Sequence, residues 1–217
     1  MHFLKWQLAD SAFPTGSFAH SSGLEAAWQG GEVPDEAALH RFVRDVVHQA
    51  GSASLPLLTA VYRDPARLAE LDQLADVFLT NAVANRASRM QGRAFLSTCA
   101  RVWPSPSLCR LEAEHSERHG HAAPVTGAIM RELDVSLLTA QRLFLYNSAR
   151  GVLAAGVRLG IIGSYDAQRL QFESGPIMDA VIARCGDLDD SALAQTAPLV
   201  DLWQASQDRL YSRLFQS

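Results

Sequence analysis

Residues 34–50, PDEAALHRFVRDVVHQA, decide the fold class of this 217-residue chain. Apolar side chains recur there at helical spacing, and charged side chains occupy the other faces. Pro34 and Asp35 are typical of a helix start, and Gly51 is typical of a helix end. The sequence therefore predicts an amphipathic helix that buries one face. Its apolar positions are Ala38, Leu39, Phe42, Val43, Val46, Val47 and Ala50.

The same helical spacing dominates the rest of the chain, and the alternating pattern of strands is nearly absent. We therefore predict that residues 1–217 form one all-α domain, a helical bundle of about eight to ten helices. The further helices are expected over 64–102 with a break near Asp72, 107–119, 125–133, 136–159, 164–184 with a bend at Gly175-Pro176, and from 189 to the C-terminus.

The composition excludes several functions. Of the 19 basic residues only Lys5 is a lysine, and it lacks the Gly-Lys-Ser/Thr context of a phosphate-binding loop. A net charge of −4 without a basic run argues against nucleic-acid binding. Three cysteines without a CxxC pair, no secretory leader and no long apolar run predict a cytoplasmic protein that does not span a membrane. No cofactor is indicated.

Residues 7–25, QLADSAFPTGSFAHSSGLE, interrupt the helical pattern. One interpretation is a buried connecting turn in which Gly16 and Gly23 adopt positive φ angles. The other is a functional surface. A serine hydrolase fits poorly, because neither Ser17 nor Ser21 stands in the Gly-x-Ser-x-Gly elbow that follows a strand.

A histidine-rich stretch suggests a metal site. A helix over 107–119 would place Glu112, His115 and His119 on one face, with His121 just beyond it. These three histidines are candidate ligands of nickel or zinc. The alternative is a solvated helix end where imidazoles interact favourably with the last carbonyls.

The C-terminal residues 207–217, QDRLYSRLFQS, are unusually apolar for a chain end. On a helix, Leu210 with Leu214 and Tyr211 with Phe215 would form one apolar strip. Such a tail either docks on its own domain or is held for a partner, since aromatic residues are favoured in interfaces.

Two helices carry polar groups within apolar surroundings. Arg86, Arg89 and Arg93 lie on one of them, and Tyr146 and Arg150 lie on another. Such groups usually form solvated faces or hydrogen-bonded core positions. They could equally line a groove or a polar passage.

Five short motifs follow one another along the chain, and in this order they resemble the urease accessory protein F family of nickel-urease maturation. Two departures are Ser17, where the family has a second glycine, and His20, where it has an aromatic residue. The motifs are Pro14, Gly16, Phe18, Ser21, Gly23, Leu24 and Glu25 within 8–25, Arg86 to Gly92, His121 to Gly127, Tyr146 to Arg150, and Tyr211, Arg213, Leu214 and Phe215 in the tail.

The resemblance implies a non-catalytic, all-α homodimer. Family members bind accessory protein D, also called H, and together they recruit the GTPase accessory protein G to urease apoprotein, where nickel is delivered. The motif residues and the 207–217 tail are then partner-binding elements, and the family member regulates the GTPase step and contributes to a nickel passage. A direct nickel-binding metallochaperone that uses the histidines is the alternative.

Overall fold

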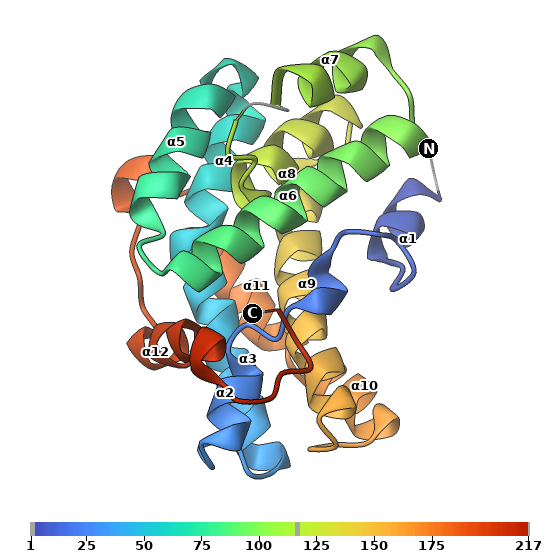
Figure 1. Ribbon diagram of the computed structural model, residues 1–217. Coiled ribbons are helices and arrows are strands. Elements are labelled where there is room, and N and C mark those ends of the chain that lie inside the picture. The colour runs from blue at the N-terminus through green and yellow to red at the C-terminus, as the bar shows by residue number, and fades with distance from the viewer. Residues whose placement is uncertain (1–2, 116–117, 217) are drawn as a thin grey trace.

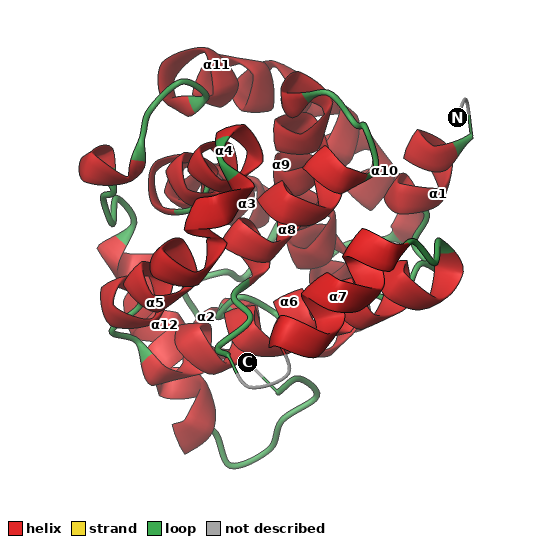
Figure 2. Cartoon of the chain, turned by 90° about the horizontal axis from the view of Figure 1, so that it is seen from above, coloured by secondary structure: helices red, strands yellow, loops and turns green. Residues whose placement is uncertain are grey.

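The computed structural model describes residues 3–115 and 118–216, without the side chain of His115 (Figure 1). Within these ranges every regular element is a helix (Figure 2), which confirms the all-α prediction. The first two α-helices have six residues each, and the other ten have between 9 and 22. They are α1 (Leu4–Ala9), α2 (Leu24–Gln29), α3 (Glu36–Ala53), α4 (Leu55–Arg63), α5 (Leu68–Phe78), α6 (Ala82–Val102), α7 (Pro106–His115), α8 (Ala122–Glu132), α9 (Leu137–Arg158), α10 (Ser164–Glu173), α11 (Gly175–Cys185) and α12 (Pro198–Ser206).

The core is built around α4, in which every residue from Leu55 to Val61 is buried. Helix α8 packs against α4 at Gly127, where a Cβ atom would overlap the carbonyl oxygen of Leu58. Only glycine allows the two backbones to approach this closely. Helix α6 packs on α8, and α9 packs on α3 and α10, so that the buried side chains form one hydrophobic cluster.

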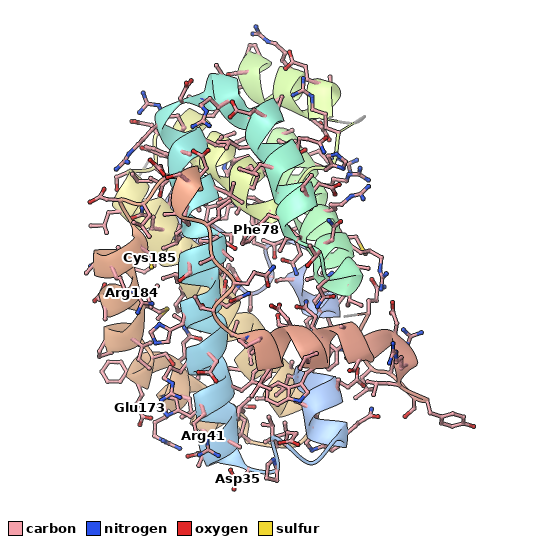
Figure 3. The ribbon with its side chains drawn as sticks, turned by 90° about the vertical axis from the view of Figure 1, so that its left-hand side faces the viewer. Asp35, Arg41, Phe78, Glu173, Arg184 and Cys185 are labelled. Carbon is pink, nitrogen blue, oxygen red and sulfur yellow. The ribbon has the colours of Figure 1, made fainter. Side chains whose placement is uncertain are left out.

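Helix α3 confirms the amphipathic helix predicted around residues 34–50. Asp35, at the lower end of α3 in Figure 3, caps it by accepting a hydrogen bond from the Ala38 amide at 2.8 Å. The predicted end at Gly51 is wrong, because the helix continues to Ala53. Gly51 instead provides room for Val181 of α11, which a Cβ atom at this position would overlap.

Two other predicted boundaries are wrong. The break expected near Asp72 lies at residues 79–81, where Asn81 caps α6 with hydrogen bonds to the amides of Val83 and Ala84. The helix expected over 107–119 ends at His115. His119 therefore does not share a helix face with Glu112.

The predicted C-terminal helix is also shorter than expected. Residues 193–197 are irregular before α12. Pro198 disfavours helical geometry at Ala197, whose φ and ψ are −124° and 70°, so that α12 begins at Pro198. A 3₁₀ turn over Gln207–Arg209 follows α12, and the chain then becomes extended at Leu210. The described tail residues 210–216 contain no helix.

Helix α1 lies at the edge of the molecule, where Phe3, its N-cap residue, is 82% exposed and Trp6 is 74% exposed. Helix α12 lies across α2 and contacts α3 and α6, which brings the C-terminal tail to the N-terminal segment (Figures 1 and 3). None of the described helices combines the length and the apolar character required to span a bilayer.

Candidate partner-binding site

The N-terminal segment turns sharply at two glycines. Gly16 and Gly23 have φ angles of 74° and 86°, which confirms that they adopt positive φ. Between them, Ser17–Ala19 forms a 3₁₀ turn, so the serine at position 17 has an ordinary backbone conformation. At Gly23 a Cβ atom would lie 2.7 Å from the backbone nitrogen of Gln204 in α12. The segment is therefore shaped to receive α12 and the residues after it.

Glu25 holds the tail through its buried carboxylate, which is 1% exposed. This carboxylate accepts hydrogen bonds from the backbone amides of Leu214 (2.6 Å) and Phe215 (3.2 Å) and from Nε2 of Gln207 (2.6 Å). Glu25 lies on helix α2, next to the fully buried side chain of Leu24. Charge-assisted hydrogen bonds of this kind are stronger than neutral ones.

An arginine between two aromatic rings fixes the end of the tail. The Cζ atom of Arg158 lies 4.1 Å from the ring centroids of both Phe18 and Phe215. Its Nη1 donates to the carbonyl oxygen of Phe18 at 2.6 Å, and the amide of Gln216 donates to that of Ala19 at 2.8 Å. Phe215 is 4% exposed. The tail therefore docks on its own fold at Phe215.

The tail begins with an ion-pair network. Both carboxylate oxygens of Asp208 lie 2.9 Å from Nη2 of Arg86, and Oδ1 also accepts from Arg213 at 3.2 Å. This pairing places Arg86 of α6 at the tail. About half of each of these side chains is exposed. Because ion pairs at the surface contribute little to stability, this network mainly orients the start of the tail.

Other tail side chains face solvent. Tyr211 is fully exposed and Leu214 is 62% exposed, while Leu210 is partly buried. The carbonyl of Ser212 accepts a hydrogen bond from Gln29 of α2 at 3.0 Å. The predicted apolar strip is therefore wrong. With no helix, Tyr211 and Phe215 separate, and only Phe215 is buried.

The remaining residues of the N-terminal motif have structural contacts. Pro14 is exposed, and its carbonyl accepts a hydrogen bond from the Thr98 hydroxyl of α6 at 2.8 Å. The buried hydroxyl of Ser21 lies 3.4 Å from the amide of Glu25. Ser17 pairs with Thr15 at 2.9 Å. These contacts tie the segment to α6 and to the start of α2.

Tyr146 and Arg150 lie on the face of α9 that supports the N-terminal helix. The guanidinium of Arg150 donates to the carbonyl of Ala9 and lies 5.8 Å from the ring centroid of Tyr146. Burial lowers the pKa of Arg150. These contacts tie the pair to the end of α1.

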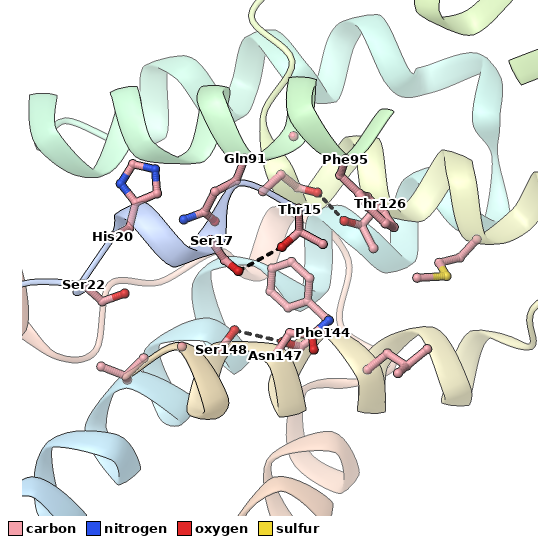
Figure 4. A pocket seen from close by; sticks show the side chains of 16 residues that line it. Thr15, Ser17, His20, Ser22, Gln91, Phe95, Thr126, Phe144, Asn147 and Ser148 are labelled. Atoms are coloured by element: carbon pink, nitrogen blue, oxygen red, sulfur yellow. Dashed lines mark hydrogen bonds between the residues drawn. The ribbon is translucent and has the colours of Figure 1, made fainter. Parts of the chain in front are cut away.

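A cavity of about 160 Å³ lies between the N-terminal segment, α6, α8 and α9 (Figure 4). Thr15, Ser17 and His20 line it from the segment, and Asn147 and Ser148 line it from α9. A second cavity, of about 170 Å³, shares part of this lining and extends to His121. The shared residues are Ser22, Gln91, Ala122, Phe144 and Ser148.

The candidate metal ligands are placed differently from the prediction. The side chain of His115 lies outside the described residues. His119 and His121 meet Asp76 of α5, and one side-chain ligand atom of each lies within 4.8 Å of the others. Burial lowers the pKa of His121, although the carboxylates of Asp72 and Asp76 oppose this effect.

The sequence interpretation missed several residues that organise these sites. Asp72 and Asp76 lie four positions apart on α5, a spacing that places them on one helix face and was available as a signal. Arg158 and Asp208 carry no comparable signal, since their partners are far away in the sequence.

Comparisons with known proteins match the whole chain. The sequence model of the UreF family matches residues 33–175. The urease accessory protein F of Oryza sativa subsp. indica is 35% identical over 219 residues, which cover 97% of this chain and 83% of the rice protein. That of Arabidopsis thaliana is 33% identical over 223 residues, with 100% and 93% covered. The urease accessory protein UreF of Bacillus sp. (strain TB-90) is 28% identical over 222 residues, with 98% and 97% covered.

Proposed function

This chain belongs to the UreF family of urease accessory proteins, and we propose that it acts in urease maturation as a non-catalytic adaptor whose docked C-terminal tail binds accessory protein D/H. The single observation that supports this role is the docking of the tail on the N-terminal motif. The backbone at Leu214 and Phe215 is anchored to Glu25, whereas Tyr211 faces solvent.

The docked tail is preorganised for binding. A tail already held in one conformation loses less entropy when a partner binds to it. Tyrosine supplies a large contact area and is frequent among residues that dominate binding energy. Tyr211 and Leu214 are exposed on this anchored segment, and 73% of Phe18 is exposed on the segment that holds it. These three side chains form the proposed contact surface.

The adaptor role assigns the nucleotide chemistry to another protein. The lone lysine, Lys5, has no phosphate-binding loop around it. The adaptor, as a homodimer in the cytoplasm, would recruit and regulate the GTPase accessory protein G and bring it to urease apoprotein. Nickel would be the cargo of this assembly.

The two cavities, which share five lining residues, support a contribution to nickel transfer. Their lining includes hydroxyl, amide and imidazole groups, among them Ser22, Gln91 and His121. Such groups can replace water around a cation for a short time, and a conducting path must also release its ion. The cavities therefore suit a passage.

Truncation after Gln207 tests the adaptor role. We expect the shortened chain to lose pull-down of accessory protein D/H, while its helical circular dichroism stays close to that of the full chain. Arg118→Ala is the control, because it alters an exposed charge outside the tail. Retained pull-down by the truncated chain would contradict the proposal.

A further inference from the structure

Three potential metal ligands converge beside α5. Oδ1 of Asp76 lies 3.3 Å from Nδ1 of His119 and 3.2 Å from Nε2 of His121. The two histidines belong to the segment before α8, and Asp76 belongs to α5, so tertiary packing brings the three atoms together. The imidazole of His121 is 1% exposed, and that of His119 is 31% exposed.

The spacing of these atoms fits a metal ion. Zinc binds histidine nitrogen and carboxylate oxygen at about 2.0–2.2 Å, and two ligands of a tetrahedral ion are then roughly 3.3–3.6 Å apart. The two separations from Asp76 are within 0.2 Å of that range, and the ligand atoms of His119 and His121 lie within 4.8 Å of each other. Side-chain rotation that adjusts this last separation would allow an ion to make all three bonds.

The outer nitrogen of each histidine already has a partner. Nε2 of His119 lies 3.1 Å from Oε1 of Gln73, an oxygen that only accepts hydrogen bonds. When Nε2 of His119 donates to this oxygen, Nδ1 presents a lone pair toward Asp76. Nδ1 of His121 lies 3.1 Å from the Ser88 hydroxyl. Hydrogen bonds to the ring nitrogen that does not face the ion orient the histidines of metal sites.

Backbone contacts also hold the histidine segment in place. The buried carboxylate of Asp72 accepts hydrogen bonds from the backbone amides of Gly120 (2.9 Å) and His121 (2.7 Å). These two bonds hold the segment on α5 in addition to the contacts that the imidazoles make with Asp76.

The cluster is accessible from the surface. Asp72 and Asp76 contribute two carboxylates, and the guanidinium of Arg89, 3.9 Å from Oδ1 of Asp76, offsets part of their charge. Asp76 lines an open surface groove together with Arg86, Arg89 and Arg93, and His121 lines the internal cavity of about 170 Å³. An ion could reach the cluster from the groove, with water as a fourth ligand.

We propose that Asp76, His119 and His121 bind one divalent first-row transition-metal ion, with nickel and zinc as the ions best suited to two imidazoles and a carboxylate. This set of ligands differs from the three histidines, His115, His119 and His121, that the sequence suggests. It is a property of the isolated chain, so it does not depend on partner binding by the tail.

Calorimetric titration of the tag-free full chain with Ni²⁺ and with Zn²⁺ tests this site. We expect one equivalent of at least one of these metals to bind with micromolar or tighter affinity. His119→Gln should weaken that binding by at least about tenfold, since even loss of a group that only hydrogen-bonds to a ligand can cost that much. His48→Gln is the matched control, because it makes the same change on α3, away from the cluster.

Thermal unfolding with and without metal provides a second measurement. The metal that binds should raise the melting temperature of the wild type and of His48→Gln, and raise that of His119→Gln much less. The metal-free melting temperature of His119→Gln shows whether the variant is folded. Binding of neither metal at micromolar concentration, or binding that His119→Gln leaves unchanged, would overturn the proposal. Binding that depends on His115 and not on His119 would overturn it too.

Discussion

Replacing Glu25 by glutamine should release the C-terminal tail from the fold. The carboxylate of Glu25 accepts three hydrogen bonds, two from the tail amides of Leu214 and Phe215 and one from Gln207. Glutamine has nearly the same shape but only one acceptor oxygen. Its NH₂ group must then face at least one of these donors.

The magnitude follows from these contacts. If the glutamine oxygen faces Phe215 and Gln207, the bond to Leu214 is lost. A hydrogen bond to a charged group contributes about 1.5–3 kcal/mol net. The neutral amide costs less to bury than the carboxylate, which offsets part of the loss. We therefore expect the docked tail to be destabilised by about 2 kcal/mol, which corresponds to roughly a 30-fold change in the docking equilibrium.

Amide hydrogen exchange of residues 210–216 measures this effect directly. Protection of the Leu214 and Phe215 amides should fall by roughly 30-fold in Glu25→Gln. Glu32→Gln is the matched control, because Glu32 is exposed and lies in the loop after α2. Unchanged protection of both amides in Glu25→Gln would refute the account of tail docking.

Three further predictions concern the backbone and the pH dependence of stability. A residue with a Cβ costs roughly 1–2 kcal/mol in a left-handed conformation. Gly23→Ala should lower the free energy of unfolding by more than this, because its Cβ would also collide with α12. Gly31 has φ of 78° and open space around it, so Gly31→Ala should show the backbone cost alone in urea denaturation. Gly151→Ala should raise the free energy of unfolding by about 0.5–1 kcal/mol, because this helical glycine has open space around it. Burial, and then the charge of Arg86, lower the pKa of His20 below its ordinary value of 6.5. The unfolded chain therefore binds more protons than the folded chain, and the free energy of unfolding should fall as the pH drops through 6.5. His20→Gln should remove part of that fall in denaturation curves measured at several pH values, and an unchanged pH dependence would count against this assignment.

The helices could be predicted from the sequence because their periodicity is local. The apolar positions of 34–50 identified α3, and the sharp turns at Gly16 and Gly23 followed from their position between helical patterns. The end of α3 could not be predicted in this way. Gly51 looks like a stop signal until Val181, 130 positions along the chain, is seen to need its space.

The tail and the cluster of Asp76, His119 and His121 show what local patterns miss. The spacing of Tyr211 and Phe215 suits a helix, but the tail amides of Leu214 and Phe215 donate to a distant carboxylate, that of Glu25, in place of helical hydrogen bonds. The histidine-rich stretch 112–121 points to His121, whereas its partner Asp76 lies 45 positions earlier. Tertiary contacts override local preference at both places, and both are candidate functional sites.

The affinity of accessory protein D/H for Tyr211→Ala tests the central claim most directly. Tyr165→Ala is the matched control, since Tyr165 is 93% exposed on α10. We expect Tyr211→Ala to weaken binding by at least about tenfold, with stability and circular dichroism unchanged, and Tyr165→Ala to bind like the wild type. Equal affinities for wild type and Tyr211→Ala would contradict the proposal that the docked tail presents this side chain to the partner.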